Sequence, residues 1–497
     1  MTKGKKHLEL CRNPRWQAED LGKPVPDSPH ATSVALPLWR HVAGYEAGDP
    51  AVLGKMVCGY PRFVFQPLVA ELFAACAAQH AGPGECCAVF PSRRVAERAA
   101  AFIQAKSGRA TRLVPLSAAK ATVLVAPAEA QDTLKRFWQH FGELVSSRQA
   151  QAILHGRDPA PTGAKNTVRT RLARLAGSQV QDVYLYPTGI AALAEAHRMV
   201  QALTPRAKSV QVGFPYVDVL KIQTETEPGV HFFPGAVAEK APQVEALLAQ
   251  ETVSGVICEF AGNPLLTSVD VVRLAEVLRA RGVPLIVDET LGTFVNVDLM
   301  PYADAVVTSL TKYFAGVGDV MGGSLVLNPD SPFCERFRTY LDAHHEDLLW
   351  EEDAQALAAY SKDFPERMRR INTTAETLCD YLHEHPKVDT LYYPKYTTPH
   401  HYTQVHRAGG GFGGLCSILL KDAARTAPAF YDALRVTKGP SLGADFTLAC
   451  PYTLLAHYNE LERVEALGVS RYLVRVSVGL EDSGDLGARF EAALDAV

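Results

Sequence analysis

The sequence has no large excess of charge of either sign. Its 497 residues include 50 Lys and Arg against 54 Asp and Glu, which gives a net charge of -4 at pH 7. A polybasic surface that attracts nucleic acid or an anionic membrane is therefore not expected, and a small, diffusible partner is the better expectation. The 47% hydrophobic content is enough for real cores in about two to four domains.

Metal-binding spacings, disulfide frameworks and membrane-spanning runs are also missing. The only close pair among the ten cysteines, Cys86 and Cys87, is adjacent, so neither a CxxC site nor a compact disulfide framework is present. No apolar run reaches the roughly 18 residues that a spanning helix needs, and the N-terminus lacks a continuous apolar segment. We therefore expect a cytoplasmic protein with reduced cysteines, no metal and no membrane contact.

The composition and the order of predicted helices and strands divide the sequence into four regions. We expect an N-terminal arm over 1–70, an inserted α/β segment over 71–160, a large domain over 161–330 and a C-terminal domain over 331–497. The arm is rich in Pro, Gly and charge. The inserted segment has the pattern of a strand, a helix and two further strands.

The large domain alternates helices with short strands that are apolar almost throughout. These strands are SVQVGF, SGVICEF, VPLIVDE, ADAVVTS and GSLVLN. Strands without inward-outward alternation, separated by helices, are typical of a parallel sheet that is buried on both faces. The C-terminal region begins with long helices and then has alternating strands, so it predicts a separate α+β domain.

Polar residues that follow two of these strands mark positions where a parallel sheet binds ligands. Asp288 ends one strand, and Ser309, Thr311 and Lys312 follow another. Each has an ordinary structural explanation when taken alone. The aspartate can cap a helix or form a turn, and the lysine can extend into solvent.

A third strand end turns through Thr188 and Gly189 directly into a helix. Free N–H groups at a helix start form an anion site, although Thr188 can equally be a plain helix cap. Together, a phosphate-binding turn, a strand-end carboxylate and a half-buried lysine match the needs of pyridoxal phosphate. These needs are a phosphate site, a partner for the pyridinium nitrogen and a lysine that forms a Schiff base.

Several segments carry a family resemblance beyond this pattern. VDETLGTFVNVD, SLTKYFAGVGDVMGGSLVLNP, EFAGNPLL and YLVRVSVGLED resemble the Cys/Met-metabolism group of fold-type-I pyridoxal phosphate enzymes. The pattern over nearly the whole chain is similar to the fungal-type cystathionine γ-synthases. The resemblance implies an α/β fold with a large, mostly parallel-sheet cofactor domain and a smaller C-terminal α+β domain.

The resemblance also implies roles for individual residues around the cofactor. Lys312 would form the Schiff base and move protons, and Asp288 would pair with the pyridine nitrogen. Tyr216 would stack on the cofactor face, although a tyrosine in the core is an alternative. The expected phosphate-binding groups are the N–H groups of Gly189 and Ile190 and the hydroxyls of Ser309 and Thr311.

The resemblance assigns three residues to the substrate. Arg475 would bind the α-carboxylate, with the alternative that it simply faces water. Asn263 would hydrogen-bond the cofactor or the substrate, unless it is only a turn residue before proline. Ser441, in the segment SLGADF, is expected beside them.

Tyr60 and Arg62, in GYPRF, resemble a Tyr-x-Arg element that reaches into the neighbouring subunit's site in this family. Tyr60 is expected to be catalytic together with Lys312 and Tyr216, and Arg62 is expected to contact the phosphate. Arg148 is a rival for that contact. A homodimer or homotetramer with shared active sites is therefore implied.

The resemblance implies γ-replacement on an O-acyl-L-homoserine. A thiol such as L-cysteine would add to a vinylglycine ketimine and give L-cystathionine. Shorter relatives carry a glutamate where this chain has Phe446, a difference that would remove a charge from the substrate side of the pocket. γ-Elimination, or replacement by a carbon nucleophile in specialised amino-acid or natural-product biosynthesis, therefore stays an alternative.

Overall fold

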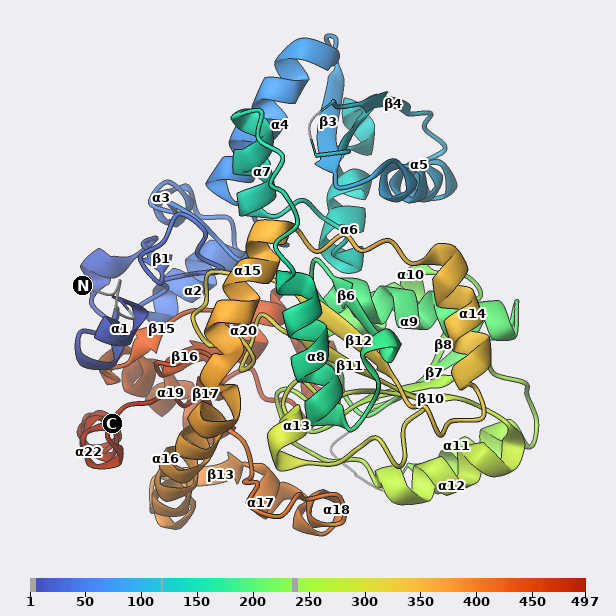
Figure 1. The fold of residues 1–497 in the computed structure, drawn as a ribbon. Helices are drawn as coiled ribbons and strands as arrows, with labels where there is room; N and C mark the ends of the chain where they lie inside the picture. Colours follow the sequence, from blue (N-terminus) through green and yellow to red (C-terminus); the bar gives the residue numbers. More distant parts are fainter. Residues whose placement is uncertain (1–5, 118, 235–239) are drawn as a thin grey trace.

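The computed structural model describes residues 6–117, 119–234 and 240–497, so the first five residues of the expected arm lie outside it. In Figure 1 the large domain lies below the inserted segment, and the N-terminal arm lies beside the C-terminal domain. In the described part of the chain, no helix is both long and apolar enough to cross a membrane.

The large domain is built on a seven-stranded sheet. Its strand order is β6 (Val183–Tyr186), β12 (Gly323–Leu327), β11 (Ala305–Ser309), β10 (Leu285–Asp288), β9 (Val256–Glu259), β7 (Ser209–Val212) and β8 (Val230–Phe233). β12 is antiparallel to both of its neighbours, and the strands from β11 to β8 are parallel. This confirms the predicted, mostly parallel sheet.

The helices that cover this sheet explain why its strands are apolar throughout. Val287 faces a core formed with α8 (Ala164–Ala176), α11 (Ala241–Leu248) and α12 (Val271–Arg281). Its neighbour Ile286 faces a second core on the other side of the sheet. Because successive side chains of a strand point to opposite faces, a sheet covered on both faces needs apolar residues at every position.

The second core contains helices of the large domain and joins them to the inserted segment. The large-domain helices are α9 (Gly189–Leu203), α10 (Val217–Glu225) and α14 (Cys334–His344). The inserted segment comprises α4 (Pro67–His80), β3 (Glu85–Phe90), α5 (Arg93–Ser107), β4 (Arg112–Pro115), β5 (Thr122–Pro127), α6 (Gln131–Phe141) and α7 (Ser147–Leu154). Its strands pair antiparallel in the order β3-β5-β4. The predicted strand, helix and two strands are therefore present, and they share one continuous core with the large domain.

The C-terminal domain has a five-stranded, mostly antiparallel sheet. Its order is β13 (Val388–Tyr392), β14 (Leu415–Leu420), β17 (Val474–Ser477), β16 (Leu448–Pro451) and β15 (Thr437–Lys438). The short helix α13 (Thr293–Asn296) lies between β10 and β11 of the large domain. The helices after α14 are α15 (Glu351–Tyr360), α16 (Phe364–Glu384), α17 (Pro394–Thr397), α18 (Pro399–Thr403), α19 (Ala423–Ala433), α20 (Tyr452–Ala456), α21 (Leu461–Glu465) and α22 (Ser483–Asp495). This is the predicted α+β pattern.

The N-terminal arm is attached to the C-terminal domain through its backbone. Its elements are α1 (Glu9–Arg12), β1 (Pro24–Val25), β2 (Ser33–Val34), α2 (Trp39–Glu46) and α3 (Pro50–Leu53). The Leu36 amide donates to the Lys438 carbonyl at 3.1 Å, and the Tyr431 hydroxyl donates to the Leu36 carbonyl at 2.7 Å. These contacts direct the following residues of the arm toward the large domain.

Candidate active site

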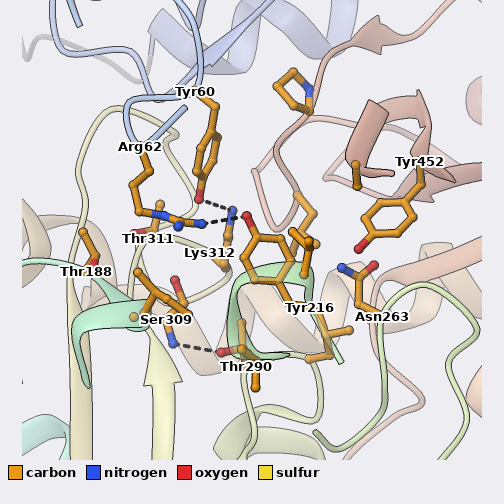
Figure 2. A pocket seen from close by; sticks show the side chains of 18 of the residues that line it. Tyr60, Arg62, Thr188, Tyr216, Asn263, Thr290, Ser309, Thr311, Lys312 and Tyr452 are labelled. Atoms are coloured by element: carbon orange, nitrogen blue, oxygen red, sulfur yellow. Dashed lines mark hydrogen bonds between the residues drawn. The ribbon is translucent and has the colours of Figure 1, made fainter. Parts of the chain in front are cut away.

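A cavity with about 1250 Å³ of space free of protein atoms lies at the carboxyl ends of the parallel strands. β9 contributes Glu259 to its wall, β10 contributes Asp288 and β11 contributes Ser309. The arm and the C-terminal domain supply the remaining walls, and Figure 2 shows ten of the lining side chains with labels. The predicted site residues other than Ser441 are therefore brought from distant parts of the sequence into the lining of one cavity.

Lys312 lies beyond the end of β11, and its amine faces two hydroxyl groups. Its Nζ is 3.3 Å from the Tyr60 hydroxyl (Figure 2). The same Nζ is 3.4 Å from Ser441 Oγ. Burial lowers the pKa of Lys312, with Tyr60 acting in the opposite direction. Burial alone would raise the pKa of Tyr60, but Lys312 and Arg62 hold it below its ordinary value. A lysine in this environment gives up its proton more readily than a solvated one, as Schiff-base chemistry requires.

The turn into α9 has the features of a phosphate site. Thr188 caps the helix, since its Oγ1 accepts from the Ala191 N–H at 3.0 Å. Within the described part of the chain, the N–H groups of Gly189 and Ile190 have no hydrogen-bond acceptor, as is usual for the first turn of a helix. A Cβ on Gly189 would lie 2.6 Å from Ser309 Cβ, so only glycine lets this turn approach β11 so closely.

The two hydroxyl residues expected at the phosphate differ in their surroundings. The Ser309 N–H donates to Thr290 Oγ1 at 2.8 Å, and its side chain adjoins the α9 turn. Thr311 Oγ1 accepts from the Gly322 N–H at 3.1 Å and lies 3.4 Å from the Gly322 carbonyl. Both residues line the cavity, but the Thr311 hydroxyl already has a backbone partner.

Two carboxyl groups lie side by side at the floor of the cavity. Asp288 and Glu259 are register partners on β10 and β9. Burial raises the pKa of Asp288, and burial together with Asp288 raises the pKa of Glu259 to about 8. Asp288 Oδ1 accepts from the Thr290 N–H at 2.9 Å. A cation such as a protonated ring nitrogen would stabilise this pair, so the floor fits the pyridinium partner that the sequence predicts.

The sequence reasoning missed Glu259, although a signal was available. Glu259 ends β9 just as Asp288 ends β10, so the strand-end rule applies to both. Its carboxylate accepts from the Tyr216 N–H at 2.5 Å and from the Asn263 N–H at 3.2 Å. Glu259 therefore holds the backbone of two predicted site residues.

Arg62 is fixed in the cavity wall by residues that local sequence patterns do not reveal. Its Nη1 donates to Asp218 Oδ2 at 2.5 Å and to the Gln139 carbonyl at 2.6 Å, and its Nη2 donates to the Tyr216 hydroxyl at 2.6 Å (Figure 2). The other Asp218 oxygen lies 2.8 Å from His140 Nδ1. Gln139 and His140 belong to α6, so the inserted segment helps to hold the arm's arginine in place.

The position of Tyr60 and Arg62 differs from the place in a neighbouring subunit's site that the family resemblance implies for them. In this single chain both side chains line the chain's own cavity, because the arm folds back over its own C-terminal domain. Arg148, the rival for the phosphate contact, lies outside that cavity. Its guanidinium lies 3.1 Å from Asp353 and 3.5 Å from Asp319.

Arg475 is buried, so the alternative of a solvent-facing arginine is wrong. Its Nη1 donates to Asn263 Oδ1 at 3.3 Å, and its Nη2 donates to the carbonyls of Pro440 at 2.8 Å and Ser441 at 3.1 Å. The guanidinium carbon lies 4.8 Å from the ring centre of Tyr452, a cavity residue that the sequence reasoning also missed. These contacts orient a permanent positive charge in the wall of the cavity.

The expectation that Phe446 lies on the substrate side of the pocket is wrong. Phe446 is 1% exposed and packs in a cluster with Leu10, Val25 and Leu448 instead of lining the cavity. An apolar ring is favourable there because the arm covers this part of the C-terminal domain. The acid on the arm side of the cavity is Glu46, at the end of α2.

Comparisons with known proteins agree with this geometry. The profile of the family described as "Cys/Met metabolism PLP-dependent enzyme" matches residues 125–495, and that of "Fungal trans-sulfuration enzyme, N-terminal domain" matches residues 68–146. The chain is 34% identical to the cystathionine gamma-synthase-like enzyme iboG2 of Amanita muscaria, over 96% of each chain. It is 33% identical to the cystathionine gamma-synthase of Neurospora crassa, over 96% of this chain and 98% of the relative. The crystal structure of metB from Corynebacterium glutamicum is similar with a TM-score of 0.57 and 25% identity, covering 66% of this chain and 84% of that one.

Proposed function

Because this chain belongs to the Cys/Met-metabolism family of pyridoxal phosphate-dependent enzymes, we propose that it catalyses a γ-replacement. The acyloxy group of an O-acyl-L-homoserine is exchanged for the sulfur of the L-cysteine thiol, which gives L-cystathionine, a carboxylate and the proton of the thiol. The observation that carries this proposal is the half-buried Lys312 in a cavity that also contains Asp288 and Arg475. The 33% identity to the cystathionine gamma-synthase of Neurospora crassa supports the same reaction.

The residues present fit the cofactor, and each has a distinct task in holding it. Lys312 would hold the aldehyde carbon, Asp288 the ring nitrogen, and the Gly189 and Ile190 N–H groups the phosphate. Tyr216 would cover one face of the ring. When bound, pyridoxal phosphate withdraws electrons from the substrate, which stabilises negative charge beside its Cα and Cβ.

Arg475 binds the α-carboxylate of the homoserine ester. Its planar guanidinium suits a bidentate pair with a carboxylate, and the Tyr452 ring and the Pro440 carbonyl restrict its orientation. Asn263, 3.3 Å from Arg475 Nη1, adds a polar group on the same side. The substrate Cα is thereby held within reach of the Lys312 amine.

Lys312 Nζ removes the proton from the substrate Cα and then a proton from Cβ, which allows the γ-acyloxy group to leave as a carboxylate. Tyr60, with its hydroxyl 3.3 Å from Nζ and its pKa lowered, exchanges protons with the lysine. Apolar side chains such as Phe63, Leu442 and Leu455 line the cavity and exclude water, which favours addition of a thiol over hydrolysis.

The test compares products in the presence and absence of a thiol. The purified holoenzyme is incubated with O-acetyl-L-homoserine or O-succinyl-L-homoserine, with and without L-cysteine, and products are identified by mass spectrometry beside Lys312→Ala. Cystathionine that forms only with cysteine supports the proposal. Release of a 2-oxo acid and ammonia without thiol would instead establish γ-elimination. If neither cystathionine nor a 2-oxo acid forms, replacement by a carbon nucleophile becomes the reaction to test.

We also propose that the chain forms a homodimer or homotetramer, as the family resemblance implies. Tyr60 and Arg62 reach the cavity of their own chain, so this assembly is not required to complete those two positions. Sedimentation equilibrium of the holoenzyme measures the assembly directly, and a monomer would contradict it.

A further inference from the structure

The last turn of α2 brings one acidic side chain to the cavity wall. Tyr45 and Glu46 both line the cavity, next to Leu455 and Ala456 of α20. Further apolar groups on the C-terminal side of the cavity come from Pro440 and Leu442. Glu46 is therefore a carboxyl group set in a largely apolar wall.

Glu46 differs from the other charged groups of the cavity because it has no partner. Lys312 contacts Tyr60 and Ser441, and Arg62 and Arg475 are each hydrogen-bonded to side-chain and carbonyl oxygens. Glu259 accepts two backbone N–H groups. Among the residues that the structure describes, none forms a hydrogen bond or an ion pair with the Glu46 carboxyl.

A partly buried carboxylate without a hydrogen-bond or ion-pair partner lowers the stability of a protein unless a ligand group supplies that partner. Burial raises the pKa of Glu46 to about 7, which reflects this cost. The hydroxyl of the adjacent Tyr45 stays neutral, because burial and Glu46 raise its pKa. A cationic ligand group beside Glu46 would restore the charged carboxylate.

The chemistry of the γ-replacement indicates which cation is available. The homoserine ester has its nitrogen at the cofactor beside Lys312 and its carboxylate at Arg475, so both of its charged groups have partners. The second substrate, an amino-acid thiol, brings an ammonium group of its own. Phe446 stands where shorter relatives carry a glutamate, but its apolar ring is buried away from the cavity, so this position provides no carboxylate for the ammonium group.

We propose that Glu46 binds the α-ammonium group of the second substrate and thereby selects a thiol that carries an amine. This inference rests on the proposed γ-replacement and deepens it. Glu46 acts on the nucleophile alone, so its removal leaves the binding of the homoserine ester unchanged. The arm thus determines the specificity for the second substrate.

The test uses three thiols that separate the two charged groups of cysteine. L-Cysteine carries ammonium and carboxylate, cysteamine only the ammonium, and 3-mercaptopropionate only the carboxylate. In the holoenzyme, Glu46→Gln should raise the KM for cysteine and cysteamine about tenfold or more, the size of a lost charge-assisted hydrogen bond. The KM for 3-mercaptopropionate and for the homoserine ester should stay unchanged.

Two further variants keep the test decisive. Glu46→Asp should retain the preference for amine-bearing thiols, whereas Glu71→Gln, an exposed acid on α4, should behave as wild type. An equal rise in KM for all three thiols, or no rise for cysteine, would overturn the assignment. Failure of the wild type to form a thioether with any thiol would instead refute the proposed function, and this inference with it.

Discussion

Tyr60 can be tested as a residue of its own chain by mixing two inactive variants. Its hydroxyl lies 3.3 Å from Lys312 Nζ within one chain. Lys312→Ala removes the amine, and Tyr60→Ala removes the phenol that we propose exchanges protons with it. We expect each variant alone to retain less than about 1% of wild-type activity, since a positioned acid or base contributes roughly 10²–10⁴-fold.

A Tyr60 that serves its own chain and a Tyr60 that serves the partner subunit predict different activities for an equal mixture of the two variants. If subunits exchange at random, half of the dimers contain one chain of each variant. With Tyr60 donated to the partner subunit, one of the two sites in each mixed dimer would be complete, so about a quarter of wild-type activity would return. With Tyr60 serving its own chain, every site lacks one residue and no activity returns.

The assay is cystathionine formation by the oligomers that assemble when the two variants are co-expressed in equal amounts. A mixture of wild type with Lys312→Ala serves as the control, and it should retain about half of the wild-type activity because half of its chains are intact. Recovery of about a quarter in the mixture of the two variants would refute the placement of the arm over its own cavity.

Two further changes test the contacts around the cavity, and a third tests a buried histidine of α9. Asp218→Asn breaks a buried ion pair and should cost about 3–5 kcal/mol of stability, measured by urea unfolding, and should weaken pyridoxal phosphate binding. Gly189→Ala adds a Cβ within 2.6 Å of its neighbour and should raise the Kd for the cofactor at least tenfold; an unchanged Kd in a fluorescence titration would contradict the tight turn. His197 is buried and its pKa is lowered to about 4, so the unfolded state binds more protons between pH 6.5 and 4. The free energy of unfolding should therefore fall as pH decreases through this window, and His197 should account for up to about 3 kcal/mol of the fall. His197→Gln should abolish this contribution to the pH dependence, whereas the control His155→Gln, at an exposed position, should leave it unchanged.

Several residues that the sequence proposed for the site and that line this cavity follow simple local rules. Asp288 and Lys312 come after apolar strands, and Gly189 starts a helix after a strand. In a parallel sheet these ends meet at one edge, so their proximity follows from local pattern alone. The predicted parallel sheet is confirmed for the same reason, since strands buried on both faces are apolar throughout.

The contacts that sequence analysis missed depend on packing between distant segments. Arg62 and Asp218 are 156 positions apart, and no local spacing relates them or predicts the contribution of α6. The burial of Phe446 under the arm likewise depends on where the arm lies. Glu259 is different, because the same strand-end rule that identifies Asp288 would have found it.

We propose that Lys312 is the residue that holds pyridoxal phosphate in this cavity. The most direct measurement is borohydride reduction of the holoenzyme, followed by proteolysis and mass spectrometry of every lysine-containing peptide. We expect a phosphopyridoxyl mass on the peptide with Lys312, and loss of the visible absorbance band in Lys312→Ala. A label on another lysine, or no label in a protein saturated with the cofactor, would contradict it.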